Sequence, residues 1–296
     1  MMDEEIYRKY VRAGRIAADA RNYGIKHIGE GVSYLEIAEM VEKRIKDAGA
    51  ELAFPVNLSV NEVAAHFTPA HNDKLFFKKG DVVKLDVGAH VDGYIADTAA
   101  TVEVESENYS ALIDASREAL MKVVDIVKPG MGLGEIGRIV SDTIESKGFK
   151  PIENLSGHSL QRYILHAGLS IPNVPDSTHE VLRKGQVVAI EPFASTGAGH
   201  VVSRGVSNIY RYVRMPLFRD VKTRVMAKKI KMRFNTLPFA ERWCTSFIPD
   251  TKNGLRRMVV AGSIYGYPQL IDGAKGIVSQ HEHTIIVTED GCEVTT

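Results

Sequence analysis

Four acidic side chains interrupt stretches of the sequence whose composition is otherwise that of apolar β-strands. Two of them lie in VVKLDVGAHVDGYIADTAATV, residues 82–102, where two apolar halves flank the turn-forming residues AHVDG. One lies in VVAIEPF and one in SQHEHTIIV. Strands disfavour acidic side chains, so their presence needs a physical reason. The four residues are Asp86, Asp97, Glu191 and Glu282.

The two acids of residues 82–102 are predicted to lie side by side. A hairpin centred between Val91 and Asp92 makes Asp86 and Asp97 direct cross-strand partners. Such partners place their Cβ atoms about 4.5–5.5 Å apart, a distance at which two carboxylates repel each other. The arrangement therefore calls for a positive charge between them. Taken alone, this stretch is equally compatible with a surface hairpin whose Asp side chains are solvated.

A histidine completes a set of residues that could bind metal ions. His158, in NLSGHSL, is preceded by a glycine that leaves its imidazole open to close approach. One such Glu in a strand is usually a satisfied structural acid, but four acids with a combined charge of −4 match two divalent cations. Oxygen ligands with one imidazole and no thiolate suit Mn, Fe, Co or Zn. His281 and His283 are a rival ligand pair, although strand alternation directs them away from Glu282.

The elements that must position these residues alternate along the chain in two similar blocks. Helical periodicity and end signals predict helices at residues 3–23, 33–48, 109–127 and 133–147. Besides the hairpin, strands are expected at residues 54–66, 184–191 and 276–288. Each block runs from helices into acid-bearing strands, so we predict an α+β fold with a duplicated design. Gly132–Gly137 matches G-x-G-x-x-G, but no strand precedes it, which argues against a dinucleotide site.

Composition restricts the class of protein. Of 296 residues, 44% are hydrophobic and 25% charged, as in ordinary globular proteins. No apolar run approaches the ~20 residues of a membrane span, and the N-terminus lacks the apolar core of a signal peptide. Cys244 and Cys292 form no C-x-x-C pair, which argues against a disulfide framework or a thiolate metal site. We expect a cytoplasmic protein with no membrane contact.

The net charge is zero, but positive and negative residues are unevenly distributed along the chain. Residues 203–258 contain fourteen Lys and Arg against three acids, a net of +11, so the remainder carries −11. Apolar residues are interleaved with these cations. The segment is compatible with the solvated face of a packed helix, and it is also compatible with a surface that binds phosphate.

The order Asp, Asp, His, Glu, Glu, carried by LDVG-x4-GYIADTA, NLSGHSL, AIEPF and HEHT, resembles the pita-bread metallopeptidase family. Within it, two features are similar to the type 2 methionine aminopeptidases. One is the segment FPVNLSVNEVAAHFTP, residues 54–69. The other is the long stretch of sequence between Glu191 and Glu282, because the type 2 enzymes have a helical insertion at that place. The resemblance implies a single catalytic domain, residues 1–296, with the insertion at about 203–265. It also favours the short archaeal-style form without an extra N-terminal domain.

The resemblance implies a pseudo-twofold α+β fold with a central curved antiparallel sheet, and two divalent metal ions. Asp97 and Glu282 would bridge both ions, Asp86 would complete one site, and His158 with Glu191 would complete the other. The implied activity removes the initiator Met from nascent polypeptide N-termini when the next residue is small, through attack by a metal-bridging hydroxide. Glu191 would accept the proton. The expected substrate contacts are His66, His166 and, lining a pocket for the Met side chain, Phe54.

Two other functions remain open at this point. One is an X-Pro-cleaving enzyme of the same fold, although such relatives usually carry an N-terminal domain. The other is a non-catalytic scaffold that binds RNA or ribosomes through the basic segment. The complete set of expected ligands argues against the scaffold as the only function. For the enzyme we expect a monomer with a weak contact to the ribosome or its RNA through residues 203–258.

Overall fold

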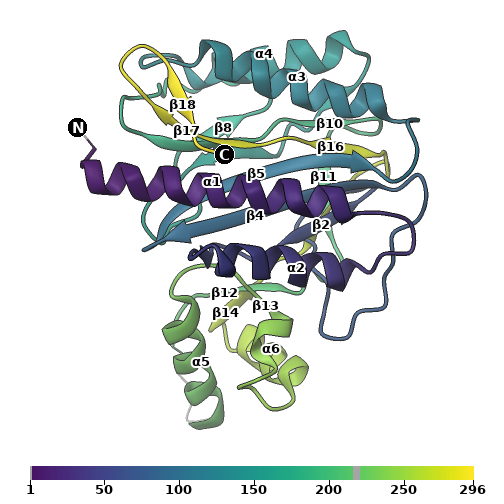
Figure 1. Ribbon diagram of the computed structural model, residues 1–296, viewed down its shortest axis with the longest axis vertical. Helices are drawn as coiled ribbons and strands as arrows, with labels where there is room; N and C mark the ends of the chain where they lie inside the picture. Colours follow the sequence, from purple (N-terminus) through teal and green to yellow (C-terminus); the bar gives the residue numbers. More distant parts are fainter. Residues whose placement is uncertain (1, 216–220) are drawn as a thin grey trace.

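Two helix pairs cover strands in the computed structural model, which describes residues 2–215 and 221–296 (Figure 1). The first pair is α1 (Glu4–His27) and α2 (Tyr34–Asp47), and the second is α3 (Ser110–Ile126) and α4 (Leu133–Ser146). All four occur where periodicity predicted helices, although α1 ends four residues later than expected. Among the described residues, no helix combines the length and apolar character needed to cross a membrane.

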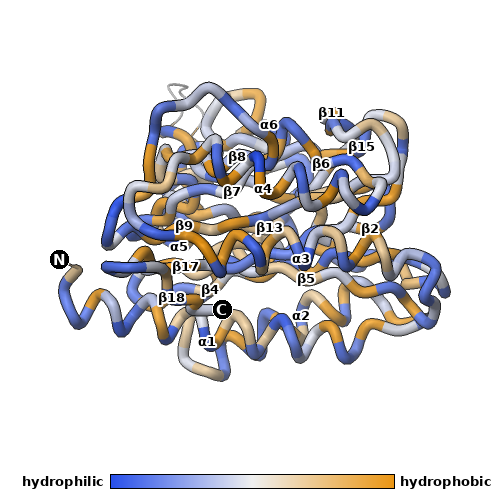
Figure 2. The backbone as a smooth tube through the Cα atoms, turned by 90° about the horizontal axis from the view of Figure 1, so that it is seen from above, coloured by the Kyte–Doolittle hydropathy of each residue, from blue (hydrophilic) through white to orange (hydrophobic). Residues whose placement is uncertain are grey.

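Small residues let α1 lie close to the strands. Its buried face consists of Tyr10, Ala13, Gly14, Ala17, Ala20 and Gly24, at the three- and four-residue spacing of one helix face. A Cβ on Gly24 would lie 2.5 Å from a methyl carbon of Leu85, so only glycine fits there. Figure 2 shows hydrophilic and hydrophobic residues alternating along α1 and α2, which form the outer layer on that side.

The predicted hairpin is present, but its predicted register is wrong. Strands β4 (Val82–Val91) and β5 (Tyr94–Glu103) are joined by Asp92 and Gly93, whose φ angles are 52° and 87°. Two residues with positive φ form the tight turn whose twist suits a hairpin, so the turn centre lies one residue later than predicted. Asp97 consequently faces Gly88, not Asp86. The two acids remain diagonal neighbours on one face of the hairpin.

Every strand pairing in the described part of the chain is antiparallel. The hairpin sheet also contains β1 (Glu51–Leu52) and β2 (Asn57–Val60). A second sheet, in spatial order, comprises β18 (Cys292–Val294), β17 (His283–Val287), β9 (Val187–Ile190), β7 (Ser156–Ser159) and β8 (Ser170–Pro172). There are two smaller sheets, each given in spatial order. One comprises β16 (Val278–Gln280), β10 (Phe193–Ser195) and β6 (Lys150–Pro151). The other comprises β11 (Val201–Arg204), β15 (Gln269–Asp272) and β3 (Val63–Ala65).

The strand predicted at residues 276–288 is divided in two at the acidic residue. β16 ends at Gln280 and pairs with β10, whereas β17 begins at His283 and pairs with β9. Between them, Glu282 pairs with Ala99 of β5 through an isolated bridge, with N···O distances of 3.0 and 3.3 Å. This bridge joins the hairpin sheet to the strands of the second half.

The segment predicted as a helical insertion is only partly helical. It contains α5 (Val221–Phe234), a short 3-10 helix (Glu241–Cys244) and α6 (Thr251–Val260). It also contains a three-stranded sheet of β13 (Phe239–Ala240), β12 (Ile209–Tyr212) and β14 (Ile264–Gly266). These elements enclose a hydrophobic cluster of their own, including Ile230, Phe239 and Leu255, and form the lower lobe in Figure 1. Arg219 of the basic segment lies outside the described residues.

Candidate metal centre

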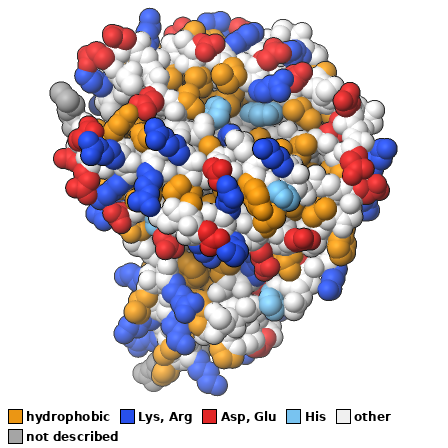
Figure 3. Space-filling view, viewed as in Figure 1, with side chains coloured by type: hydrophobic (Ala, Val, Ile, Leu, Met, Phe, Trp, Pro, Cys, Tyr) orange, Lys and Arg blue, Asp and Glu red, His pale blue; other side chains and the backbone are white. Residues whose placement is uncertain are grey.

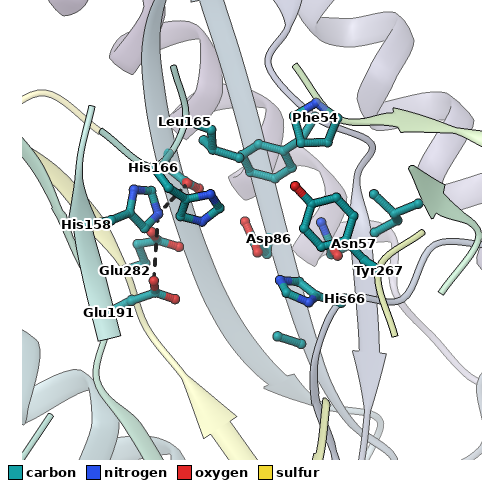
Figure 4. A pocket seen from close by; sticks show the side chains of 14 residues that line it. Phe54, Asn57, His66, Asp86, His158, Leu165, His166, Glu191, Tyr267 and Glu282 are labelled. Carbon is teal, nitrogen blue, oxygen red and sulfur yellow. Dashed lines mark ion pairs between the residues drawn. The ribbon is translucent and has the colours of Figure 1, made fainter. Parts of the chain in front are cut away.

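All eight residues predicted to bind metal or contact substrate line one cavity between the two halves of the fold (Figure 4), and the rival pair His281 and His283 does not. The cavity contains about 510 Å³ of space, including its open mouth. Its lining joins Asp86 of β4 and Asp97 of β5 to residues of the second half. Those residues are His158, His166, Glu191 and Glu282; Phe54 and His66 come from the segment around β2 and β3.

The distances between these side chains are those of a compact cluster. His158 Nε2 lies 3.5 Å from Asp97 Oδ2 and 3.8 Å from Glu191 Oε1. One ligand atom each of Asp97, His158 and Glu282 lies within 4.8 Å of the others, and all three residues are buried. The amide of Gln280 donates to Glu191 Oε2 at 3.3 Å and to Glu282 Oε2 at 3.4 Å, so it orients both carboxylates.

Hydrogen bonds between threonine side chains and the backbone fix the strands that carry the bridging candidates. Asp97 N donates to Thr284 Oγ1, which in turn donates to Asp97 O, both at 2.8 Å. Thr98 Oγ1 donates to Glu282 O at 2.8 Å, and Arg21 of α1 donates to the same hydroxyl. The two acids are thus held on segments that are bonded to each other across the cavity.

Several polar atoms of the residues that line this cavity have no hydrogen-bond partner among the described residues. They are His66 Nδ1, Asp86 Oδ1, Asp97 Oδ1, His158 Nδ1, Glu282 Oε1 and Asn57 Oδ1. Buried polar atoms are almost always paired, so a concentration of unpaired carboxylate oxygens indicates a ligand that bonds to them. Oxygen and imidazole donors in this combination fit divalent cations such as Mn, Fe, Co or Zn.

The pKa values of the cavity residues also indicate a bound cation. Burial raises the pKa values of Asp86, Glu191 and Glu282 well above the usual range, and the neighbouring carboxylates raise them further. Burial also raises the pKa of Asp97 to about 7, although hydrogen bonds with Asp86 and Thr98 oppose the effect. Burial lowers the pKa of His158 to about 4, so the ring is neutral at pH 7. The carboxylates must bind protons or cations, and the histidine is in the form that binds metal.

Comparison with known proteins decides the family. The sequence matches metallopeptidase family M24 over residues 8–289. This chain belongs to family M24. It is 48% identical to the methionine aminopeptidase of Methanocaldococcus jannaschii over 295 residues, which covers 100% of both chains. It is also 48% identical to that of Pyrococcus abyssi, over 97% of this chain and 98% of the relative.

A solved structure agrees with the fold of this M24 chain. The crystal structure of methionine aminopeptidase from Thermotoga maritima superposes with a TM-score of 0.74 at 26% identity. The match covers 100% of this chain and 98% of that chain. The pita-bread fold predicted from the resemblance is therefore confirmed.

Two further histidines, His66 and His166, line the same cavity. The His166 ring is 4.3 Å from that of His158, centroid to centroid, and is exposed at the mouth. His66 has a φ of 64° and packs edge-on against Tyr267, with ring centroids 5.3 Å apart. Burial lowers the pKa of His66 to about 4. Both rings face the acids but are not part of the compact cluster.

Phe54 forms an apolar wall of the cavity. It is buried, and a Cβ on Gly88 would lie 2.1 Å from its ring, so the glycine opposite Asp97 makes room for the aromatic side chain. Sequence reasoning missed six lining residues: Asn57, Ala65, Leu165, Ile209, Pro238 and Tyr267. Asn57 and Leu165 stand beside recognised motifs, in FPVN and ILHAG, whereas no local pattern marks Tyr267.

Proposed function

We propose that this protein is a methionine aminopeptidase that removes the initiator Met from nascent chains when the next residue is small. The observation that carries the proposal is the full-length 48% identity to proteins of that name, combined with the buried cluster of unpaired carboxylates. A cavity closed on one side by Phe54 and lined by acids suits a peptide end that carries an apolar side chain and an amine.

The proposed cofactor is a pair of divalent ions held by Asp86, Asp97, His158, Glu191 and Glu282. Four ionised carboxylates balance the charge of two such ions, and the unpaired oxygens of Asp86, Asp97 and Glu282 would supply ligand atoms. When bound, the ions would polarise the scissile carbonyl and lower the pKa of a water molecule. Asp97 and Glu282 would be shared by the two ions; both are buried beside His158 and are held on segments that are bonded to each other.

The remaining steps belong to side chains of this protein. Glu191, beside His158, accepts the proton of the attacking water and returns it to the leaving amine. Neutral His66 and His166 donate hydrogen bonds to the oxyanion that develops on the scissile carbonyl and hold the peptide in place. Phe54 contacts the Met side chain of the first residue of the peptide.

The test combines metal analysis with a peptide assay. Purified protein should retain or bind about two equivalents of Mn²⁺ or Co²⁺ and release Met from Met-Ala-Ser. Preference for an X-Pro peptide of the same length would instead identify the X-Pro-cleaving alternative. Protein that contains the metals but cleaves neither peptide would contradict the proposal.

We propose in addition that residues 203–265 form an accessory subdomain whose basic face contacts ribosomal RNA, with the enzyme acting as a cytoplasmic monomer. Figure 3 shows Lys and Arg side chains gathered on the lower lobe. On α5, Lys228, Lys229 and Lys231 are exposed, and the only acids of residues 203–258 are Asp220, Glu241 and Asp250. Nascent substrates emerge at a surface rich in phosphate, which such a face would attract.

Charge reversal tests this contact. Binding to phosphate weakens steeply with salt, with a slope that follows the number of contacts. We expect the triple variant K228E/K229E/K231E to lose co-sedimentation with ribosomes in a salt series while its Met-Ala-Ser turnover stays unchanged. Equal co-sedimentation of the parent and the variant at every salt concentration would contradict the contact.

A further inference from the structure

One polar side chain in the cavity has no role in the chemistry described so far. Asn57 is the cross-strand partner of Asp86, on the neighbouring strand β2, and its side chain lines the cavity (Figure 4). Only 5% of the residue is exposed. Its Oδ1 atom has no hydrogen-bond partner among the described residues.

The orientation of this amide is fixed by its neighbour. Asn57 Nδ2 donates to the carbonyl oxygen of Pro55 at 2.9 Å. A carbonyl oxygen only accepts hydrogen bonds, so the reversed amide would place two acceptors against each other. The NH₂ group therefore faces Pro55, and the oxygen is the end left for the cavity. Asp86, the cross-strand partner of Asn57, is an acceptor once it is ionised and holds a metal ion. In metal-loaded protein the donor must therefore come from a ligand.

The chemistry of the ligand follows from this requirement. A peptide end offers its free α-amine as a strong donor, whereas a Met side chain offers none. We propose that Asn57 Oδ1 accepts a hydrogen bond from the α-amine of the bound peptide and thereby favours a free N-terminus. The inference rests on the proposed function and assigns one further specificity residue to the same site.

The test compares two ligands that differ only in the amine. L-methionine and its desamino analogue, 4-(methylthio)butanoate, are titrated into metal-loaded protein and followed by ligand-detected NMR. In N57L, which has nearly the same side-chain volume, affinity for L-methionine should fall about 10-fold or more, as for a lost hydrogen bond to a charged group. Affinity for the analogue should stay within about twofold of the parent, because that ligand makes no such bond.

Two variants serve as controls. S59A removes another buried, unpaired oxygen two residues along β2, at a position that does not line the cavity, and should leave both affinities unchanged. N57D should retain the preference for L-methionine, since a protonated carboxyl group can donate to Pro55 O and keep its other oxygen toward the cavity. Metal content, by elemental analysis, should be equal in all variants.

The outcomes separate this inference from the proposed function. Release of Met from Met-Ala-Ser by the parent tests the function on its own. With that activity present, a parallel loss of both affinities in N57L, no loss of either, or a loss of metal overturns the assignment of Asn57. A selective loss for L-methionine that N57D restores supports it.

Discussion

At the scale of single residues, the cavity concentrates negative charge that the protein itself does not neutralise. Asp86, Asp97, Glu191 and Glu282 line the same cavity. Arg21 lowers the pKa of Glu282, but this effect is smaller than the increase caused by burial. Leaving such carboxylates unpaired would cost several kcal/mol each in effective penalty. Occupied by cations, the same arrangement becomes a set of preformed ligands.

The two proposed bridging residues should be the most sensitive ligands. D97A or E282A removes a carboxylate shared by both ions, so we expect loss of both metals by elemental analysis and no measurable Met release. E191Q should retain part of the metal but lose turnover, because the amide cannot accept the proton. H281A is the matched control: His281 pairs with Ser116 outside the cavity, so metal should stay bound. Turnover near that of the parent in D97A, E282A or E191Q would contradict the two-metal centre.

The two histidines proposed to contact substrate, His66 and His166, should behave differently from the ligands. H66A and H166A remove donors to the developing oxyanion, and one such donor typically contributes about 10²–10³ in kcat. We expect kcat to fall by that range while metal content stays at the parent level. If elemental analysis shows metal loss in either variant, the affected histidine is a ligand.

Sequence reasoning found the charged members of the site because acids in apolar strands are rare. It missed Asn57, since an amide in a strand carries no charge and its importance depends on the Pro55 carbonyl beside it. The register of Asp86 and Asp97 was missed for a different reason. AHVDG allows more than one turn centre, and the positive φ angles of Asp92 and Gly93 select between them.

At the scale of elements, a buried ion pair connects the lower lobe to helix α2. Arg242, in the 3-10 helix, pairs with Glu42 of α2, and both side chains are almost fully buried. Arg242 also donates to Thr68 Oγ1 at 2.7 Å and to Pro69 O at 2.9 Å, just after His66 in the chain. Trp243 Nε1 donates to the second oxygen of Glu42 at 2.8 Å. The lobe therefore holds the segment that carries His66.

Breaking this pair should destabilise the protein strongly. R242M leaves the Glu42 carboxylate buried without its cation, and loss of one partner of a buried pair typically costs about 3–5 kcal/mol. In E42Q/R242M, the neutral amide still accepts from Trp243 and no charge remains, so most of that free energy should return. Equilibrium urea unfolding of the parent and both variants measures the effect. Equal unfolding midpoints for R242M and the parent would show that the pair contributes little.

The helices were predicted well because each carries a long stripe of small and apolar residues, as on α1. The lower lobe was predicted less well, since β13 and β14 are two and three residues long and contain too little sequence for a periodic pattern. The division of residues 276–288 at Glu282 was also missed, because it depends on tertiary pairing: β16 pairs with β10, whereas β17 pairs with β9.

At the scale of the whole molecule, the cavity joins two halves that are far apart in sequence. Asp86 and Asp97 belong to the hairpin covered by α1 and α2, whereas His158, Glu191 and Glu282 belong to strands of the second half. Direct bonds between the halves include the bridge from Ala99 to Glu282. Ions bound to both sets of ligands would add a further connection, so metal binding should stabilise the entire fold.

Metal removal should therefore lower the melting temperature, and the effect should depend on pH with a defined sign. In metal-free protein the pKa of Asp97 is raised to about 7, above its unfolded value. A carboxyl group of this kind loses its stabilising proton as pH rises, so metal-free protein becomes less stable on approaching and passing pH 7. Metal ions bind the ionised form, so their contribution increases over the same interval.

We expect the difference in melting temperature between Mn²⁺-loaded and EDTA-treated protein to be larger at pH 8 than at pH 5.5. Free metal at about 100 times its dissociation constant contributes about 2.7 kcal/mol per site, which is several degrees for a domain of this size. D97A provides the control, because it should show no metal-dependent change at either pH. A chelator without effect on the parent at pH 8 would mean that the two halves are held together without metal, and that the unpaired carboxylates of the cavity are stabilised by protons alone.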